Sequence, residues 1–176
     1  GSITAGLEAF AGLPMHLEPI RLRNGAIVLN DAYNANPAST AAAVRFLATL
    51  PRRGRAILVA GEMLEMGEHA EELHREVGRL CAQLRLDMVI GVEEGGRHAA
   101  ALVDEARCHG APAKACAVFA TVAKAAAYLT NDLRDGDVVL CKASRGVRLE
   151  RLCEALIAEV GSEGSEKRPL MTGEQK

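Results

Sequence analysis

The sequence predicts an α/β fold, a Rossmann-like three-layer αβα sandwich built on a mostly parallel sheet. Apolar runs of strand length alternate about five times with longer segments whose apolar residues recur at helical spacing. The short runs are continuously apolar, which is typical of strands buried on both faces of a parallel sheet. Helices that cover both faces through right-handed crossovers account for both observations.

The first half of the alternation begins with a predicted strand at 26–31. A helix at 38–49 follows, because Asn36 is a favourable N-cap residue and a proline comes directly after it. The next predicted strand, 55–62, leads to a helix at 69–84 whose leucine and valine side chains share one face.

The second half repeats this pattern. We predict strands at 86–92, 115–120 and 135–144, the last of which opens with a turn. The corresponding helices are 95–108, 121–133 and 147–160, and Thr121 is the candidate N-cap of the second. Residues 17–23 are a candidate for an additional edge strand.

The ends of the chain differ from this pattern. Residues 15–160 are predicted to form one domain of ordinary size. Residues 1–14 are predicted to be a connector from a missing upstream domain. Residues 161–176 are polar and lack periodicity, so we expect a disordered tail.

Composition narrows the class of protein. The formal net charge of -2 gives no reason to expect a nucleic-acid surface. No apolar run approaches the roughly 18 residues that span a bilayer, and no signal peptide is recognisable. The 5 cysteines form no CxxC pair, which favours free thiols in a reducing cytoplasm. His69 and His74 are poorly spaced to share a helical face, so we predict no metal site built from cysteine and histidine.

The stretch NDAYNANP, residues 30–37, follows the first strand. Helix capping explains Asn36 and the proline, but it leaves Asp31, Tyr33 and Asn34 unexplained. Ligands of open parallel sheets bind beyond the carboxyl ends of the strands, where the Asp31 carboxylate could accept hydrogen bonds from ribose hydroxyls. The alternative interpretation is a capped turn without a ligand.

The segment AGEMLEMGEH, residues 60–69, follows the next strand. Glu62 stands at the predicted strand end, directly after a glycine that permits a sharp turn. Its position makes it a candidate site residue. The alternative is a solvated acidic loop in front of a helix.

The segment CKASRG, residues 141–146, ends the last strand. It delivers Lys142, Ser144 and Arg145 together, which is the chemistry of a carboxylate or phosphate clamp. Alternatively, the two cations extend into solvent without binding anything. One acidic-polar, one acidic and one basic strand end are thus predicted at a single edge of the sheet.

The sequence has no GxxxxGK[ST] phosphate-binding loop, and GVEEGG at 91–96 does not match a dinucleotide-binding fingerprint. The chain therefore does not hold nucleotide phosphates through a P-loop of its own.

Taken together, DAYNANPAST, GEMLEMGEH and GDVVLCKASRGVRLERLCEAL resemble the C-terminal domain of the Mur ligases, over residues 7–156. Within this family, YNANP and the K-x-SRG ending look most like the branch that adds D-alanyl-D-alanine to UDP-N-acetylmuramoyl tripeptide. The resemblance implies a cytoplasmic, ATP-dependent ligase of peptidoglycan synthesis that works through an acyl phosphate. It also implies missing N-terminal and central domains, the central one binding most of the Mg²⁺, so the fragment alone should be inactive.

The resemblance further implies roles for individual residues. Asp31, Asn34 and Asn36 match the ATP-binding side of the cleft, with Asp31 on the ribose. Lys142, Ser144 and Arg145 match a substrate-binding ending, and Glu62, which replaces the usual aspartate, is placed with them. None of these residues is expected to be catalytic.

Other interpretations remain open at this point. One is a sister Mur ligase or a folylpolyglutamate-type ligase, which the YNANP motif disfavours. Another is a non-catalytic Rossmann-like module that binds a nucleotide or a dipeptide.

Overall fold

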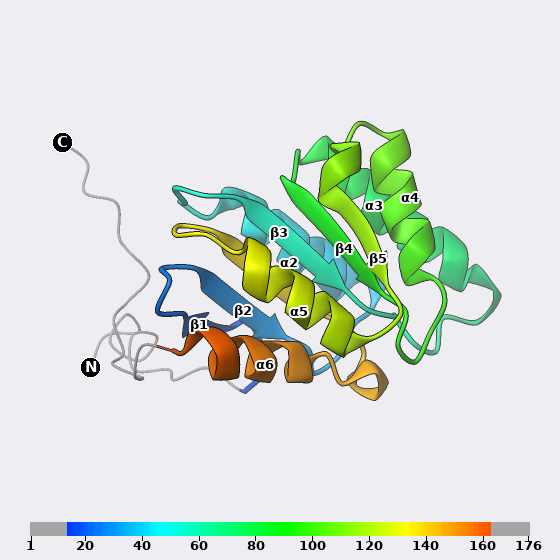
Figure 1. Ribbon diagram of the computed structural model, residues 1–176. Helices are drawn as coiled ribbons and strands as arrows, with labels where there is room; N and C mark the ends of the chain where they lie inside the picture. Colours follow the sequence, from blue (N-terminus) through cyan, green and yellow to red (C-terminus); the bar gives the residue numbers. More distant parts are fainter. Residues whose placement is uncertain (1–13, 163–176) are drawn as a thin grey trace, which may run out of the picture.

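The computed structural model describes residues 14–162 and confirms the α/β fold (Figure 1). Its six-stranded sheet has the order β1-β2-β6-β3-β4-β5. The β1–β2 pairing is antiparallel and the others are parallel, as predicted. The strands are β1 Glu18–Arg21, β2 Ile27–Asp31, β3 Ala56–Ala60, β4 Met88–Val92, β5 Cys116–Phe119 and β6 Val138–Lys142.

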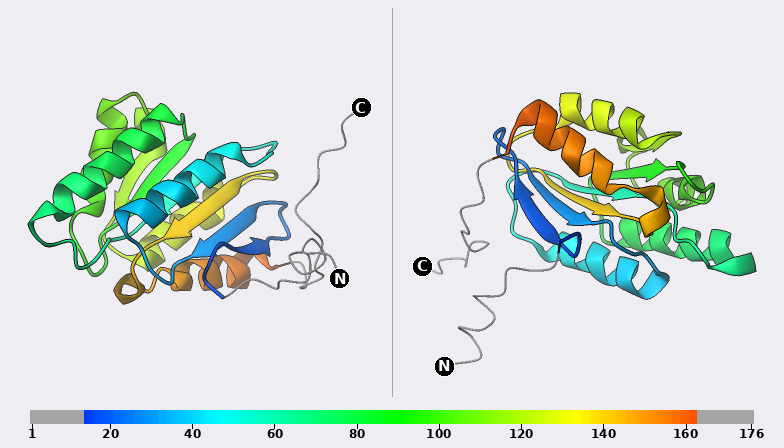
Figure 2. Two further views of the ribbon diagram at one scale, coloured as in Figure 1. Left: turned by 180° about the vertical axis from the view of Figure 1, so that it is seen from behind. Right: turned by 90° about the horizontal axis from the view of Figure 1, so that it is seen from below.

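Helices cover both faces of the sheet. On one face lie α5 (Val122–Asp132) and α6 (Glu150–Val160), which pack on β-strand residues of the first core cluster. On the other face lie α2 (Pro37–Thr49), α3 (Ala70–Gln83) and α4 (Ala99–Cys108), as Figure 2 shows from behind. Each of the two hydrophobic cores lies between the sheet and one layer of helices, which gives the three predicted layers.

Short 3₁₀ turns account for three of the differences from the predicted boundaries. Turn η1 (Gly67–His69) precedes α3, η2 (Ala113–Ala115) precedes β5, and η3 (Arg145–Val147) precedes α6. The predicted helix 95–108 starts only at Ala99, because residues 93–98 form a turn in which Gly96 N donates to Glu93 O at 3.2 Å. Strand ends and tight turns are decided by packing between distant segments, which local periodicity does not report.

The N-cap of α2 is the one predicted from the sequence. The Asn36 side chain accepts a hydrogen bond from Ser39 N at 2.8 Å, and the Ser39 hydroxyl accepts one from Asn36 N. This reciprocal pair satisfies two backbone donors that a helix start otherwise leaves unpaired. The helix therefore starts at a fixed place directly after the loop that leaves β2.

The predicted connector at 1–14 lies outside the described residues except for Pro14, and most of the predicted tail at 161–176 does too. Gly161 and Ser162 are an exception to the prediction of disorder. Arg23 N donates to Gly161 O at 3.1 Å, and Ser162 forms a β-bridge with Leu22.

All cysteines are free thiols, as predicted, and only Cys108 is exposed. Among the described residues, no helix is long and apolar enough to cross a bilayer.

Candidate functional site

The three sequence motifs meet at one edge of the sheet. β6 lies between β2 and β3, with Lys142 in register with Asp31 on one side and Ala60 on the other. Leu29 and Leu140 lie in the core on the α2 side of the sheet. Because side chains alternate between the faces of a strand, Asp31 and Lys142, two residues further on, point to that same side. The structure therefore brings together the acidic-polar, acidic and basic strand ends.

Asp31 and Lys142 form a buried ion pair. Lys142 Nζ lies 2.7 Å from Asp31 Oδ2 and donates to Asn34 O at 2.7 Å. Asp31 Oδ1 accepts a hydrogen bond from Leu17 N at 3.3 Å. Lys142 is 3% exposed, and its ammonium group is directed at protein acceptors. The pair fixes the loop between β2 and α2 to the centre of the sheet.

Ser144 ties this loop to the end of β3. Its hydroxyl donates to Ala35 O at 3.2 Å and accepts from Leu64 N at 3.0 Å, while Ser144 N donates to Glu62 O at 2.9 Å. The residue is buried. Its hydroxyl thus connects the segments after β2, β6 and β3.

The two predicted asparagines are exposed but have local roles as well. Asn36 caps α2, and Asn34 Oδ1 accepts a hydrogen bond from Ala35 N at 2.8 Å. The Asn34 backbone carbonyl is one of the acceptors of Lys142, so Lys142 fixes the backbone from which the Asn34 side chain extends.

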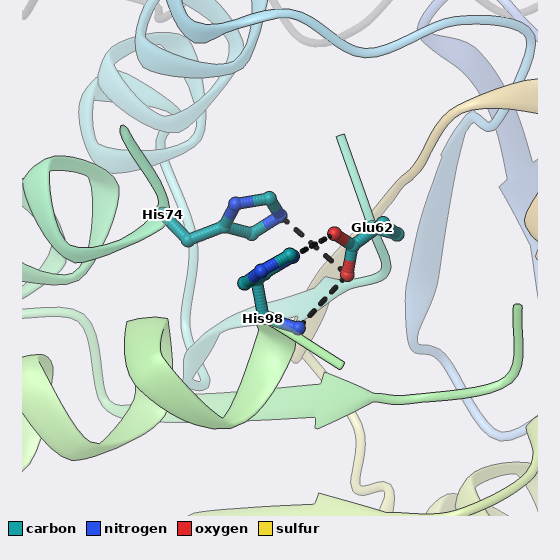
Figure 3. A group of neighbouring side chains, drawn as sticks. All are labelled: Glu62, His74 and His98. Carbon is teal, nitrogen blue, oxygen red and sulfur yellow. Dashed lines mark hydrogen bonds and ion pairs between the residues drawn. The ribbon is translucent and has the colours of Figure 1, made fainter. Parts of the chain in front are cut away.

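Glu62 is buried between His74 of α3 and His98 in front of α4 (Figure 3). Its Oε1 is hydrogen-bonded to His98 Nδ1, and its Oε2 accepts from His98 N at 3.0 Å. A carboxylate only accepts, so the ring proton of His98 is on Nδ1. Sequence reasoning found Glu62 but neither histidine partner, although His98 follows a Gly-Gly pair at a strand end.

His74 adopts the same tautomer for a different reason. Met63 N donates to His74 Nε2 at 3.0 Å, so the proton is on Nδ1, 2.6 Å from Ala70 O. Burial lowers the pKa of His74, because a charged imidazolium would lose its hydration there. The hydrogen bond from Met63 N to Nε2 requires a lone pair there, which is the neutral form of the ring.

Glu62, His74 and His98 are the described residues that could hold a metal ion, with ligand atoms within 4.8 Å of one another. A metal needs the free lone pair of a histidine nitrogen. In His74 that lone pair accepts the Met63 amide hydrogen. The three residues are of the types that bind zinc, but the group is built as a hydrogen-bonded cluster in which the His74 lone pair is already used.

Besides Asn36, the exposed part of the site includes Tyr33, His16, Arg145 and Asn34. The Tyr33 ring is 49% exposed and lies 4.7 Å from the His16 ring, centroid to centroid. The Arg145 guanidinium lies 6.0 Å from the Tyr33 centroid and donates to Met15 Sδ. Beside it is a hollow of about 470 Å³ lined by Arg145, Gly146, Arg148, Glu150, Arg151 and Glu154.

His16 is held in place by a strained segment. Met15 and Leu17 both have positive φ values, 59° and 51°, which non-glycine residues seldom adopt. Glu18 Oε2 accepts from Met15 N at 3.0 Å, and Asp31 accepts from Leu17 N. Such strain persists where surrounding contacts enforce it, and it is common at functional sites. The sequence marked Tyr33 as unexplained but gave no indication of its contact with His16.

Comparison with known proteins supports one family. The family described as Mur ligase, glutamate ligase domain, matches residues 17–145. The UDP-N-acetylmuramoyl-tripeptide--D-alanyl-D-alanine ligase of Bacillus subtilis is 32% identical over 152 residues, which cover 86% of this chain and 32% of that protein. The enzyme of the same name from Mycobacterium tuberculosis H37Rv is 35% identical over 173 residues, covering 89% and 34%.

Solved structures agree in fold. MurF from Acinetobacter baumannii has a TM-score of 0.74 at 28% identity and covers 90% of this chain and 34% of that one. A MurF ligase from Thermotoga maritima in complex with ADP has a TM-score of 0.72 at 28% identity, covering 86% and 32%. A Mycobacterium tuberculosis folylpolyglutamate synthase, at 19% identity and TM-score 0.55, shares the fold.

The chain thus spans about a third of the length of the relatives and structures that it matches. The matched region contains Asp31, Tyr33, Asn34, Asn36, Glu62, Lys142, Ser144 and Arg145, whereas Met15, His16 and the part of the hollow beyond Arg145 lie outside it. By its sequence and its fold, the chain belongs to the Mur ligase family and corresponds to the glutamate ligase domain of that family.

Proposed function

We propose that this chain is the C-terminal domain of an ATP-dependent ligase that adds D-alanyl-D-alanine to UDP-N-acetylmuramoyl tripeptide in peptidoglycan synthesis, in the cytoplasm. The observation that carries the proposal is the meeting of three family motifs at one strand-end edge, in a chain 32% to 35% identical to ligases of that name. The ADP complex of the Thermotoga maritima relative supports ATP as the nucleotide.

In this proposal the domain positions substrates and does not carry out the chemistry itself. Holding an amine and an acyl phosphate in line is a large part of the catalysis of such a reaction. The N-terminal and central domains would bind the UDP-sugar peptide and most of the Mg²⁺. The described residues support this assignment of Mg²⁺ to the other domains. The carboxylates of Asp31 and Glu62 are already paired with Lys142 and His98.

The predicted site residues then divide into two groups. Arg145, Asn34 and Tyr33 are exposed and are proposed to contact ATP or the dipeptide. Lys142, Ser144 and Glu62 are buried and hydrogen-bonded within the protein. They are proposed to hold the exposed contact residues in place. Asp31 remains the proposed ribose contact, since each carboxylate oxygen can accept more than one hydrogen bond. Asn36 contributes by fixing the start of α2.

An amide chemical-shift titration of the chain tests this function. We expect ATP to shift the amide resonances of residues 31–36 and 145–148. D-alanyl-D-alanine should shift resonances in the same segments, and L-alanyl-L-alanine should not. Millimolar ligand is needed, because the domain supplies part of the site. Equal shifts from both dipeptides, or shifts confined to the opposite end of the sheet, would contradict the proposal. Incubation with ATP and both substrates should give no turnover by this chain alone.

A further inference from the structure

The Glu62 carboxylate is held at both oxygens by one residue of another loop. His98 donates its backbone N–H to Oε2 at 3.0 Å and its ring Nδ1–H to Oε1 (Figure 3). The Glu62 side chain is 4% exposed, and that of His98 is 22% exposed. A bidentate, largely buried bond of this kind fixes the turn at 93–98 against the end of β3.

Gly96 shows how closely this turn approaches the carboxylate. A Cβ built on Gly96 would lie 2.3 Å from Glu62 Oε2, so only glycine fits. Its neighbour Gly95, at φ 82°, faces the next loop: a Cβ there would lie 3.7 Å from Gly146 O and from Val147 Cα. The turn therefore lies between Glu62 and η3.

The backbone of Glu62 supports η3 from the other direction. Glu62 O accepts from Ser144 N at 2.9 Å, directly before Arg145. A Cβ on Gly146 would lie 2.8 Å from Leu64 Cδ1, so the segment after Glu62 also packs on η3. The loop that carries Arg145 thus has two supports near Glu62: the turn at 93–98, which the carboxylate binds, and the main chain of Glu62 with the Leu64 side chain.

We propose that Glu62 is a positioning residue: its carboxylate, bound by His98, holds the turn at 93–98 and through it sets the place of the Arg145 guanidinium. The inference deepens the proposed function and depends on it only in taking Arg145 as the anion contact. It gives Glu62 a role that requires no contact with substrate.

Glu62→Gln provides a sharp test, because the amide has the same shape but one accepting oxygen. Its single oxygen cannot replace both carboxylate oxygens, so either one His98 donor faces an NH₂ group or the His98 ring proton moves to Nε2 and Nδ1 accepts from that NH₂ group; the charge-assisted hydrogen bonds are lost in both cases. We expect hydrogen exchange of the His98 amide to accelerate at least about tenfold, the factor that a hydrogen bond to a charged group contributes. Exchange of the Val147 and Arg148 amides, which are bonded within η3, should accelerate with it.

Matched variants separate positioning from general loosening. Glu65→Gln removes the same charge from an exposed residue of the same loop and should leave these amides unchanged. His98→Ala keeps the backbone donor and removes only the ring donor, so its effect on Val147 should be smaller; it also serves if Glu62→Gln fails to fold. Normal exchange at Val147 and Arg148 in folded Glu62→Gln, with fast exchange at residue 98, would overturn the proposal.

Ligand affinity supplies an independent readout. Glu62→Gln should weaken ATP binding several-fold in the wild-type background and have little further effect in Arg145→Gln, because it acts through that residue. Additive losses would overturn the proposal. If the wild-type chain binds no ATP, the proposed function fails, while the exchange measurements still decide whether Glu62 positions η3.

Discussion

Lys142 Nζ and Asp31 Oδ2 lie 2.7 Å apart, on neighbouring parallel strands and away from solvent. The residues are 111 positions apart in the chain. The sequence predicted Lys142 as a substrate-binding residue. In the structure its ammonium group instead anchors the loop after β2. The proposed substrate contacts are therefore exposed neighbours, chiefly Arg145 and Tyr33.

Replacing Lys142 by Met should destabilise the domain by about 3–5 kcal/mol, because it leaves the Asp31 carboxylate buried without a partner. Urea unfolding measures this, and Lys124→Met, at an exposed position, is the control. Adding Asp31→Asn to Lys142→Met should restore part of the loss. A Lys142→Met domain of wild-type stability that had lost only ligand binding would return Lys142 to the role of a ligand contact.

Arg145→Gln should weaken ATP binding about tenfold without loss of stability, since a charge-assisted bond to phosphate contributes about 1.5–3 kcal/mol. The Arg145 side chain is exposed, so the fold does not depend on it. Arg134→Gln makes the same charge change at the opposite end of β6 and should leave the affinity unaltered. Equal losses in both variants would show that only net charge matters.

Tyr33→Ala should weaken ATP binding about 5-fold or more, and Tyr33→Phe should not, if a base stacks on the exposed ring at about 1–3 kcal/mol. The phenylalanine variant keeps the ring that contacts His16 and removes the hydroxyl. Isothermal titration of the two variants decides the matter. A clear loss of ATP affinity in Tyr33→Phe would contradict stacking as the main contact and would indicate a hydrogen bond from the Tyr33 hydroxyl.

Features set by nearby residues were predictable from the sequence, and features set by distant contacts were not. The cap at Asn36 and the strand-end positions of Asp31, Glu62 and Lys142 depend on a few adjacent residues. Whether Lys142 reaches solvent or Asp31 depends on which strands are neighbours. The link between Glu62 and His98 joins residues 36 positions apart. The sequence therefore predicted which residues gather at the edge, but not which of them remain exposed there.

Zinc should not bind to Glu62, His74 and His98. Coordination by His74 Nε2 would leave the buried Met63 amide without its acceptor, a cost of about 1–3 kcal/mol. With equimolar Zn²⁺ the ring resonances of His74 and His98 should stay in place. Stoichiometric shifts of both rings would instead identify a metal centre at this position.

Stability should fall in acid through Asp137, at the end of β6 opposite the candidate site. Burial raises the pKa of this carboxyl, but hydrogen bonds from the Arg55 guanidinium and from the Arg55 and Arg134 amides outweigh it, so the net pKa is lowered. Arg55 Nη2 lies 2.6 Å from Asp137 Oδ2. A lowered folded-state pKa stabilises the fold above the unfolded value of about 3.9, and this is lost as pH falls through the folded-state pKa.

Asp137→Asn should therefore lower the free energy of unfolding by about 3 kcal/mol at pH 7, since it breaks a largely buried ion pair. The difference from wild type should shrink as pH falls below about 4, because the Asp137 carboxyl is then protonated in the unfolded state, and it should vanish once pH falls through the lowered folded-state pKa. Urea unfolding at several pH values measures both effects, with the exposed Asp104→Asn as the control. A difference that stays constant down to about pH 2 would mean that the carboxylate charge contributes nothing and that the destabilisation comes from altered hydrogen bonding.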